Sequence, residues 1–358
     1  LSLRRQRQMC IRDRAYVNAA GMVIKIGGDA SITALNNTHA LALSGSAALA
    51  QSDTAKSNVG VAGAYSMNML GGEARAEVMA VGELAVTANL ALAARRTGVA
   101  VTIAAGMAGA KGQKGVAVAG SAAVGVADYA NIAVLSNAAK VSARDITIQA
   151  RDLSVLATVA GAAASSDGKA GVGAAIAVNV STSNVEAGIR QVTDLLYTGR
   201  VDVSAESTQV VVGFAGAFGM ARDGAGVGGS VAVNVVSNRI ESYLINSKVT
   251  HSGAATGNHD VNVSASDKTT LVAITGAAGA GKKAGVGIAV SYNEIGNAVM
   301  AGIQGSTVDT KGHGAVNISA EDTSSLGGGA VGVGVGMGQA KFAAAGSVQV
   351  NRVLSLIH

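Results

Sequence analysis

Residues 226–234 read GVGGSVAVN, and similar stretches return along the chain at a nearly fixed distance. The stretch recurs as GVGAAIAVN at 171–179, GVGIAVSYN at 285–293 and AAAGSVQVN at 343–351, and a shorter version, VAGAYSMN, lies at 61–68. Each copy ends on an asparagine, and in VAGSAAVG Gly125 stands in that place. The repeated asparagines are Asn68, Asn179, Asn234, Asn293 and Asn351.

A second marker keeps the same period. Short alternating stretches such as VDVSA (201–205) and VNVSA (261–265) recur six times, and their last alanines are 54, 62, 55, 60 and 55 residues apart. Those alanines are Ala34, Ala88, Ala150, Ala205, Ala265 and Ala320. Two independent markers with one period identify an internal repeat of about six imperfect units, and such repeats are typical of solenoid folds.

The pattern inside each unit predicts an all-β fold. Val or Ile alternates with polar residues, which is the period of a half-buried strand, and helical spacing is almost absent. We expect four or five short strands per unit and an elongated, parallel β-helix-like solenoid with two or more coils per unit. The alternative is a stack of antiparallel β-hairpins, because polar turns such as SSDGK (165–169) are short enough to reverse the chain.

Composition sets the side-chain size in the core. The chain has 49 glycines, no proline, no tryptophan and 3% aromatic residues, while 49% of its residues are hydrophobic. Small apolar side chains predict that opposing backbone layers approach closely. Low charge excludes a disordered chain. The apolar runs, such as residues 115–127, are too short and too rich in glycine for a membrane-spanning helix, so we expect a protein that does not span a membrane.

Both ends of the chain look foreign to the repeat. Residues 4–13, RRQRQMCIRD, fit the translation of a sequencing adapter that ends in a transposon mosaic end, and residues 354–358, LSLIH, fit its reverse complement. We interpret 1–14 and 354–358 as adapter-derived scars, expect 1–14 to be unattached to the core, and take 15–353 as an internal fragment of a larger protein. Without the scars, Lys and Arg fall from 27 to 22, Asp and Glu fall from 22 to 21, and Cys10, the single cysteine, is lost. A near-neutral chain of this kind predicts no nucleic-acid partner, no disulfide and no thiolate metal site.

Two glycine-rich stretches imitate nucleotide-binding motifs. Gly224, Gly226 and Gly229 satisfy G-x-G-x-x-G, but strands are expected on both sides where a dinucleotide site needs a following helix. Gly276 and Lys282 imitate a phosphate-binding loop that lacks its Ser or Thr. We therefore expect no cofactor.

The sequence offers no catalytic or metal-binding cluster. His39, His251, His259 and His313 lack the spacing of a zinc site, so we expect solvated loop histidines. Acidic residues are spread at one or two per unit and do not converge. The repeated asparagines allow two interpretations: a ligand-binding ladder, or amides that bind the backbone at a coil corner and stack on one another. We favour the second and expect a chain that is not an enzyme.

The repeat unit resembles a known family. The pattern K-x-G-V-G-x-x-V-A-V-N, followed by spaced Asn, Ala and Ile, is similar to the repeats of leukotoxin-like filamentous adhesins, which are large surface proteins of anaerobic Gram-negative bacteria. The residues that carry it are 171–179 with Asn184, Ala187 and Ile189, 226–234 with Asn238 and Leu244, and 305–320. Gly125 and the interval from 88 to 150 depart from the pattern.

The resemblance implies a virulence-associated adhesin at the bacterial cell surface. It implies export by a type V route (two-partner or autotransporter), an outer-membrane transport partner, and an unidentified host-cell or matrix receptor. The expected role is a stalk, a contact surface, or both. Two alternatives remain: the repeat region of a secreted cytotoxin, and a fragment of a carbohydrate-active β-helix enzyme.

Overall fold

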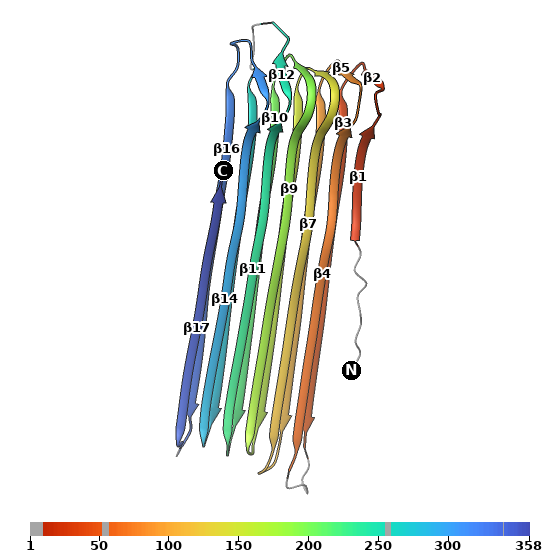
Figure 1. Ribbon diagram of the computed structural model, residues 1–358. Coiled ribbons are helices and arrows are strands. Elements are labelled where there is room, and N and C mark those ends of the chain that lie inside the picture. Colours follow the sequence, from red (N-terminus) through yellow and green to blue (C-terminus); the bar gives the residue numbers. More distant parts are fainter. Residues whose placement is uncertain (1–9, 52–56, 255–258, 339) are drawn as a thin grey trace.

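The computed structural model describes residues 10–51, 57–254, 259–338 and 340–358, and its regular elements are all strands (Figure 1). Every pair of named strands runs parallel. The prediction of an all-β parallel solenoid is confirmed, and the antiparallel hairpin stack is wrong. The described residues include no helix with the length and apolarity that a bilayer crossing requires.

Two large sheets face each other. The first sheet has the order β16-β13-β10-β8-β6-β3 and the second β1-β4-β7-β9-β11-β14-β17. The first consists of β3 (Ala30–Ala50), β6 (Leu90–Ala110), β8 (Ile146–Ser166), β10 (Val201–Ala221), β13 (Val261–Gly281) and β16 (Val316–Gly336). The second consists of β1 (Cys10–Asn18), β4 (Val59–Met79), β7 (Val116–Ala143), β9 (Ala170–Tyr197), β11 (Ala225–Ile245), β14 (Ala284–Gln304) and β17 (Phe342–Ile357).

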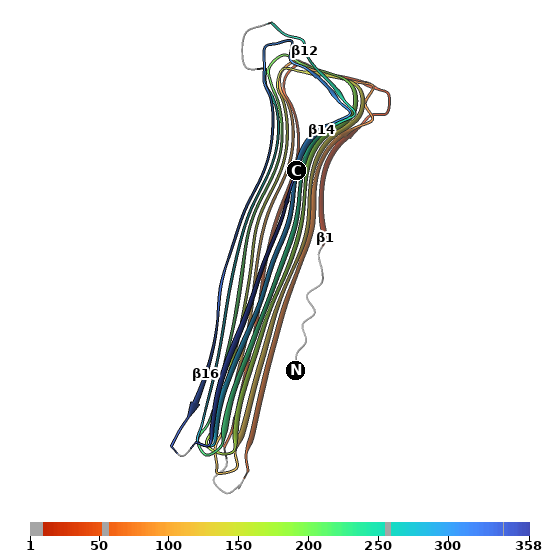
Figure 2. The ribbon, with the colours of Figure 1, turned by 60° about the vertical axis from the view of Figure 1, so that its left-hand side comes forward.

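A short third side joins the sheets at one end, which we call the proximal end. It contains β2 (Val23–Ile26), β5 (Glu83–Val86), β12 (Lys248–His251) and β15 (Thr307–Asp309), together with the last residues of β7 and β9. Figure 2 shows the consequence: the two sheets run close together over most of their length and diverge into a wide proximal end.

Each repeat unit forms one coil, so the expectation of two or more coils per unit is wrong. Val201 pairs with Ile146 of the preceding unit and with Val261 of the following one, so neighbouring coils are a whole unit apart. The VDVSA segment and the Gly/Ala run after it, expected as separate strands, are one 21-residue strand, β10. No turn residue interrupts the alternation between them, so nothing in the backbone ends the strand.

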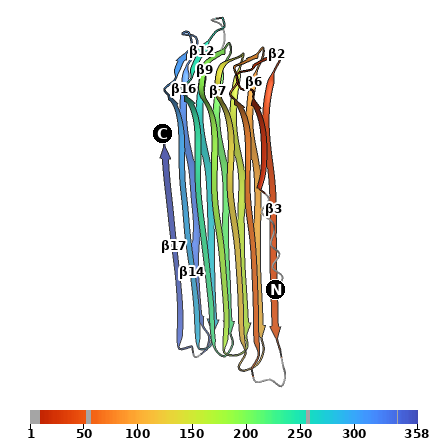
Figure 3. The same cartoon turned by 45° about the vertical axis from the view of Figure 1, so that its right-hand side comes forward.

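The chain changes sheets at the polar turns that the sequence indicated. Two or three residues separate β8 from β9, β10 from β11 and β13 from β14. These turns reverse the chain, as expected for a hairpin, but the two strands that they join lie in different sheets. Each strand then pairs with its equivalents in the neighbouring coils, which is why short turns coexist with parallel ladders (Figure 3).

A left-handed residue marks the corner where each coil leaves the second sheet. Ala80, Asn137, Gln191, Asn246 and Gly305 directly follow paired positions of β4, β7, β9, β11 and β14, and their φ angles lie between 47° and 58°. Gly and Asn occupy this conformation at the lowest cost, whereas Ala and Gln do so with strain.

The core changes character from the proximal end to the opposite, distal end. The wide proximal end is filled by Val, Leu and Ile, including Ile146, Leu195 and Val263. A smaller cluster around Leu156 and Val211 follows, and the hydrophobic side chains buried at the distal end are all alanines. The inward side chains therefore become smaller from the proximal to the distal end, where the two sheets lie closest together.

Glycine permits that convergence. A Cβ added to Gly226 would lie 1.9 Å from the carbonyl oxygen of Ala280, and one added to Gly171 would lie 1.9 Å from that of Met220. Real Cβ atoms essentially never come within 3.0 Å of such atoms. The GVG motif is thus the place where two backbones touch, in agreement with the close approach expected from composition.

The alanine marker holds its register at five of the six predicted positions. Ala34, Ala150, Ala205, Ala265 and Ala320 share one inward row of the first sheet. The sixth member of that row is Ala94, not Ala88. Ala88 follows β5 at the proximal end, where its N–H donates to the carbonyl of Gly28. LAVTA and the following LALAA share the same alternation, so the pattern does not distinguish them.

The expectation of an unattached N-terminus is wrong for residues 10–14. They belong to β1, which pairs with β4, and Arg14 donates to Glu77 at 2.6 Å. Likewise, 354–357 continue β17 along β14. An edge strand offers unpaired N–H and C=O groups that accept almost any extended segment, so pairing here says little about origin. Residues 1–9 lie outside the described residues.

Candidate functional site

The repeated asparagines form a ladder inside the core. Asn179 donates from Nδ2 to Oδ1 of Asn234 at 2.8 Å, Asn234 donates to Asn293 at 2.8 Å, and Asn293 donates to Asn351 at 2.9 Å. The first three are fully buried. They lie in mid-strand, not at a coil corner as expected, and their amides bind one another along the stack. Gly213 leaves room for them, because a Cβ there would lie 2.4 Å from Oδ1 of Asn234.

Gly125 interrupts this ladder where the sequence pattern placed it. It lies in register between Asn68 and Asn179. Asn68, isolated by the gap, donates instead to the carbonyl of Val101 at 2.7 Å and to the hydroxyl of Thr102 at 3.0 Å. The row therefore bonds to the opposite sheet where it lacks a neighbour.

A buried ion pair lies nearer the proximal end. Arg96 donates to Asp152 at 2.8 Å, both side chains are fully buried, and the guanidinium lies over the ring of Tyr129. Burial raises the pKa of Asp152, although the charge and hydrogen bond of Arg96 oppose that rise. Asn131 adds a hydrogen bond at 3.3 Å. The pair is enclosed and contacts no solvent.

Asp267 is a second buried carboxylate in the row that contains Asp152, two coils further along. Burial raises its pKa to about 6, and hydrogen bonds from Thr269 and Asn238, among others, oppose the rise. Asn297 donates to it at 2.6 Å. The sequence analysis missed both carboxylates, although each occupies an inward position of an alternating strand.

The histidines differ from the expectation of solvated loops. His251 and His259 are buried, and their ring centroids lie 4.0 Å apart at the proximal end. The ring of Tyr197 meets His251 edge-on, and the Tyr197 hydroxyl donates to the carbonyl of His259 at 3.0 Å. His39 and His313 are exposed as expected, but His39 lies within β3 and not in a loop. Within the described residues, no group of three or more His, Cys, Asp or Glu side chains is arranged to hold a metal ion.

The nucleotide-like motifs are parts of the coil. Gly226 faces inward on β11 and Gly229 outward, with a strand on each side of the Gly224 turn. Gly276 lies on the outer face of β13, and Lys282 lies in the next distal turn, 3.5 Å from Asp223. Neither motif precedes a helix.

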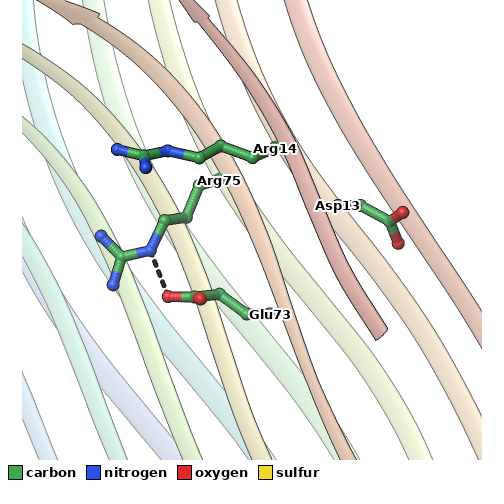
Figure 4. A pocket seen from close by; sticks show the side chains of 4 residues that line it. All are labelled: Asp13, Arg14, Glu73 and Arg75. Atoms are coloured by element: carbon green, nitrogen blue, oxygen red, sulfur yellow. Dashed lines mark hydrogen bonds and ion pairs between the residues drawn. The ribbon is translucent and has the colours of Figure 1, made fainter. Parts of the chain in front are cut away.

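A polar pocket of about 330 Å³ lies at the edge formed by β1 and β4 (Figure 4). Asp13, Arg14, Glu73 and Arg75 line it, and Arg75 is paired with Glu73. Half of its lining comes from the segment 1–14 that we interpret as a scar. The pocket is therefore a weak candidate for a site of the natural protein.

The largest candidate surface covers both outer faces of the distal part. We define the distal band as residues 212–220 of β10, 225–233 of β11 and all positions in register with them. Outward positions of β10 change from Asp202, Ser204, Glu206 and Thr208 to a wholly apolar series. That series begins with Val210 and continues within the band as Val212, Phe214, Gly216, Phe218 and Met220.

The change from polar to apolar recurs in the neighbouring coils and in the opposite sheet. Outward positions of the band in β11 are Ala225, Val227, Gly229, Val231 and Val233. Exposed members elsewhere in the band include Leu43, Val61, Met107, Ile274 and Ile288, at 50–71% exposure. No outward position of the band carries a charge in the described residues.

A shallow groove of about 610 Å³ crosses the band on the first sheet. Its floor includes Gly161, Gly216 and Gly276, and Phe214 and Phe218 stand on either side. The groove follows the stacking direction because the glycines of neighbouring coils are in register. This surface was not predicted from the sequence, because the alternation had been interpreted only for the inward positions.

Comparisons with known proteins found no matching family model, no matching curated protein and no matching solved structure.

Proposed function

We propose that residues 15–353 are a non-catalytic repeat region of an exported bacterial surface adhesin. One observation carries the proposal: each unit is one coil, and every coil presents the same lateral surfaces in register with the next. Such an array multiplies a weak contact along its length, which raises overall avidity. The resemblance of the repeat to leukotoxin-like filamentous adhesins supplies the cell-surface location and type V export.

The dimensions favour a contact surface over a simple stalk. A 21-residue strand is roughly 70 Å long, whereas each coil adds only about 4.8 Å along the stack. About 57 residues are therefore used for each 4.8 Å of length, and most of them build wide lateral faces. A stalk needs length, but this arrangement produces area.

A binding experiment tests the proposal. Residues 15–353 coupled to fluorescent beads are expected to adhere to host epithelial cells or to immobilised matrix proteins, and beads carrying an unrelated β-solenoid of similar size provide the control. Adhesion is expected to increase when two copies of the array are joined. Equal adhesion of both bead types would refute the contact role, and release of reducing sugars from polysaccharides would favour the enzyme alternative.

A further inference from the structure

We propose that the distal band inserts into the hydrocarbon core of an anionic lipid bilayer. The first argument is its inside-out composition. Inward positions of β10 within the band are Gly213, Ala215, Ala217 and Gly219, while the outward positions include Val212, Phe214, Phe218 and Met220. In a water-soluble coil the larger apolar side chains face inward, as they do at the proximal end of this chain.

The second argument is the height of the band. Nine residues at about 3.3 Å each span roughly 30 Å along the strand. The hydrocarbon core of a typical bilayer is also about 30 Å thick, and nine to eleven residues suffice for a strand to cross it. On β10 and β11, outward positions stay apolar one step beyond the band, at Val210 and Val235, so these apolar rows span eleven residues. Outward Thr208 and Ser237 follow, and then charged positions such as Arg239.

The third argument is charge complementarity beyond the band. The described residues of the distal turns carry seven exposed Lys and Arg side chains against two Asp. The cations are Lys111, Lys114, Lys169, Arg222, Lys282, Lys283 and Lys341. Cationic side chains next to an apolar segment favour anionic headgroups by about 1 kcal/mol each.

Backbone hydrogen bonding is compatible with insertion of the inner coils, whereas β3, β4, β16 and β17 pair on one side only within the band and expose backbone groups at the two ends of the array. Strands such as β8, β10 and β13 are paired along their whole length on both sides. The inner strands therefore expose no unpaired N–H or C=O groups to lipid, which is the main requirement that a bilayer imposes. Close packing of Gly and Ala between the sheets is also typical of membrane interiors.

A second copy of the chain is the competing occupant. Six strands spaced about 4.8 Å apart and 30 Å high give roughly 850 Å² per face, which is enough for a stable dimer. Charge argues against a parallel pair, because it would bring equally cationic turns together, and an antiparallel pair is an outcome of the test below. The sequence predicted no membrane-spanning segment, whereas these apolar rows exist only once the strands stack.

Site-specific labelling tests the proposal on the complete chain with Cys10→Ser. An environment-sensitive dye is attached at Ala163→Cys inside the band or at Ser204→Cys outside it; both positions face outward on the first sheet. Vesicles of phosphatidylcholine with 30% phosphatidylglycerol are expected to shift the emission of the first dye to the blue and leave the second unchanged. Lipids brominated near the middle of the acyl chain are expected to quench only the first.

Variants and controls separate the outcomes. Phe214→Ser with Phe218→Ser is expected to lower vesicle affinity at least tenfold, while Ser204→Ala leaves it unchanged. Binding that 0.5 M salt abolishes, without a dye shift at position 163, would overturn the proposal in favour of surface adsorption. A shift at 163 that depends on protein concentration and not on lipid would overturn it in favour of self-association. Neither result would refute the proposed adhesin function, because these vesicles contain no protein receptor.

Discussion

Replacing Gly226 with alanine tests whether the two sheets touch at the GVG motif. The new Cβ would lie 1.9 Å from the carbonyl oxygen of Ala280 and 2.5 Å from that of Gly219. Both are backbone atoms, so no flexible side chain can move aside. The sheets must separate locally by about 1.1 Å, the difference between 1.9 Å and the shortest ordinary approach of 3.0 Å.

The cost of that separation follows from packing. A gap of 0.5–1 Å forfeits a quarter to a half of the dispersion energy between the surfaces that it parts. Overpacking of this kind costs about 1–3 kcal/mol, and the rigid backbone partners place Gly226→Ala at the upper end, about 3 kcal/mol. Gly226 has no left-handed φ, so the cost arises from contact and not from backbone strain.

Gly229→Ala is the matched control. Gly229 lies three residues away on the same strand, faces outward, and has no atom within 4 Å of an added Cβ. We expect it to leave the free energy of unfolding within about 0.5 kcal/mol or to increase it slightly, because alanine loses less backbone entropy than glycine. Guanidinium unfolding followed by circular dichroism gives the two values, and hydrogen exchange localises the damage to β11 and β13. Equal stability of the two variants would refute the close approach of the sheets.

Four further outcomes are expected. Asn234→Ala removes two ladder hydrogen bonds and is expected to cost about 2–3 kcal/mol in chemical unfolding, whereas Asn351→Ala at the exposed end of the ladder costs under about 1 kcal/mol. Burial raises the pKa of Asp267 to about 6 in the folded state, so the protonated side chain favours folding at pH 4 and this contribution is lost as the pH rises through 6. The free energy of unfolding is therefore expected to fall by up to roughly 3 kcal/mol between pH 4 and 7. Asp267→Asn is expected to flatten this pH profile. Val263→Asp buries an unpaired carboxylate. It is expected to remove protection against hydrogen exchange from β10, β13 and β16, while the distant β3 keeps its protection. Uniform loss of protection along the chain would contradict coils that unfold independently. Lys282→Ala breaks only an exposed ion pair and is expected to shift the melting temperature by less than about 1 °C.

The repeat and its register were predictable because they depend on local patterns. The asparagine marker indicated Gly125 as a position in the ladder, and the pairing of Asn68, Gly125 and Asn179 has that order. The alanine marker failed at Ala88, where two neighbouring segments carry the same alternation. The corner at the proximal end, which depends on tertiary contacts, sets the register in which Ala94 and not Ala88 pairs with Ala34.

Strand length and the burial of polar groups were not predictable from the same patterns. The Gly/Ala run has no turn residue, so its joining to VDVSA became evident only when β8, β10 and β13 paired over 21 positions. His251 and His259 stand in a polar loop sequence, yet contacts with Tyr197 bury them. The apolar band was missed for a related reason. Alternation divides the residues of a strand between its two sides, but it does not show whether each side contacts water, lipid or the protein core.

The pairing of whole units affects which insertions and deletions such a protein can accept during evolution. Register distances of 55 and 60 residues coexist in neighbouring coils without a break in the ladders that join β8, β10 and β13. Recombination between two repeats of one gene would therefore add or remove complete coils and leave every remaining ladder intact. A single-residue insertion inside a 21-residue strand acts differently, because it exchanges the inner and outer side chains of every position beyond it. Selection on a gene of this kind is expected to tolerate the gain or loss of whole coils and small changes between strands, and to oppose single-residue insertions within a strand.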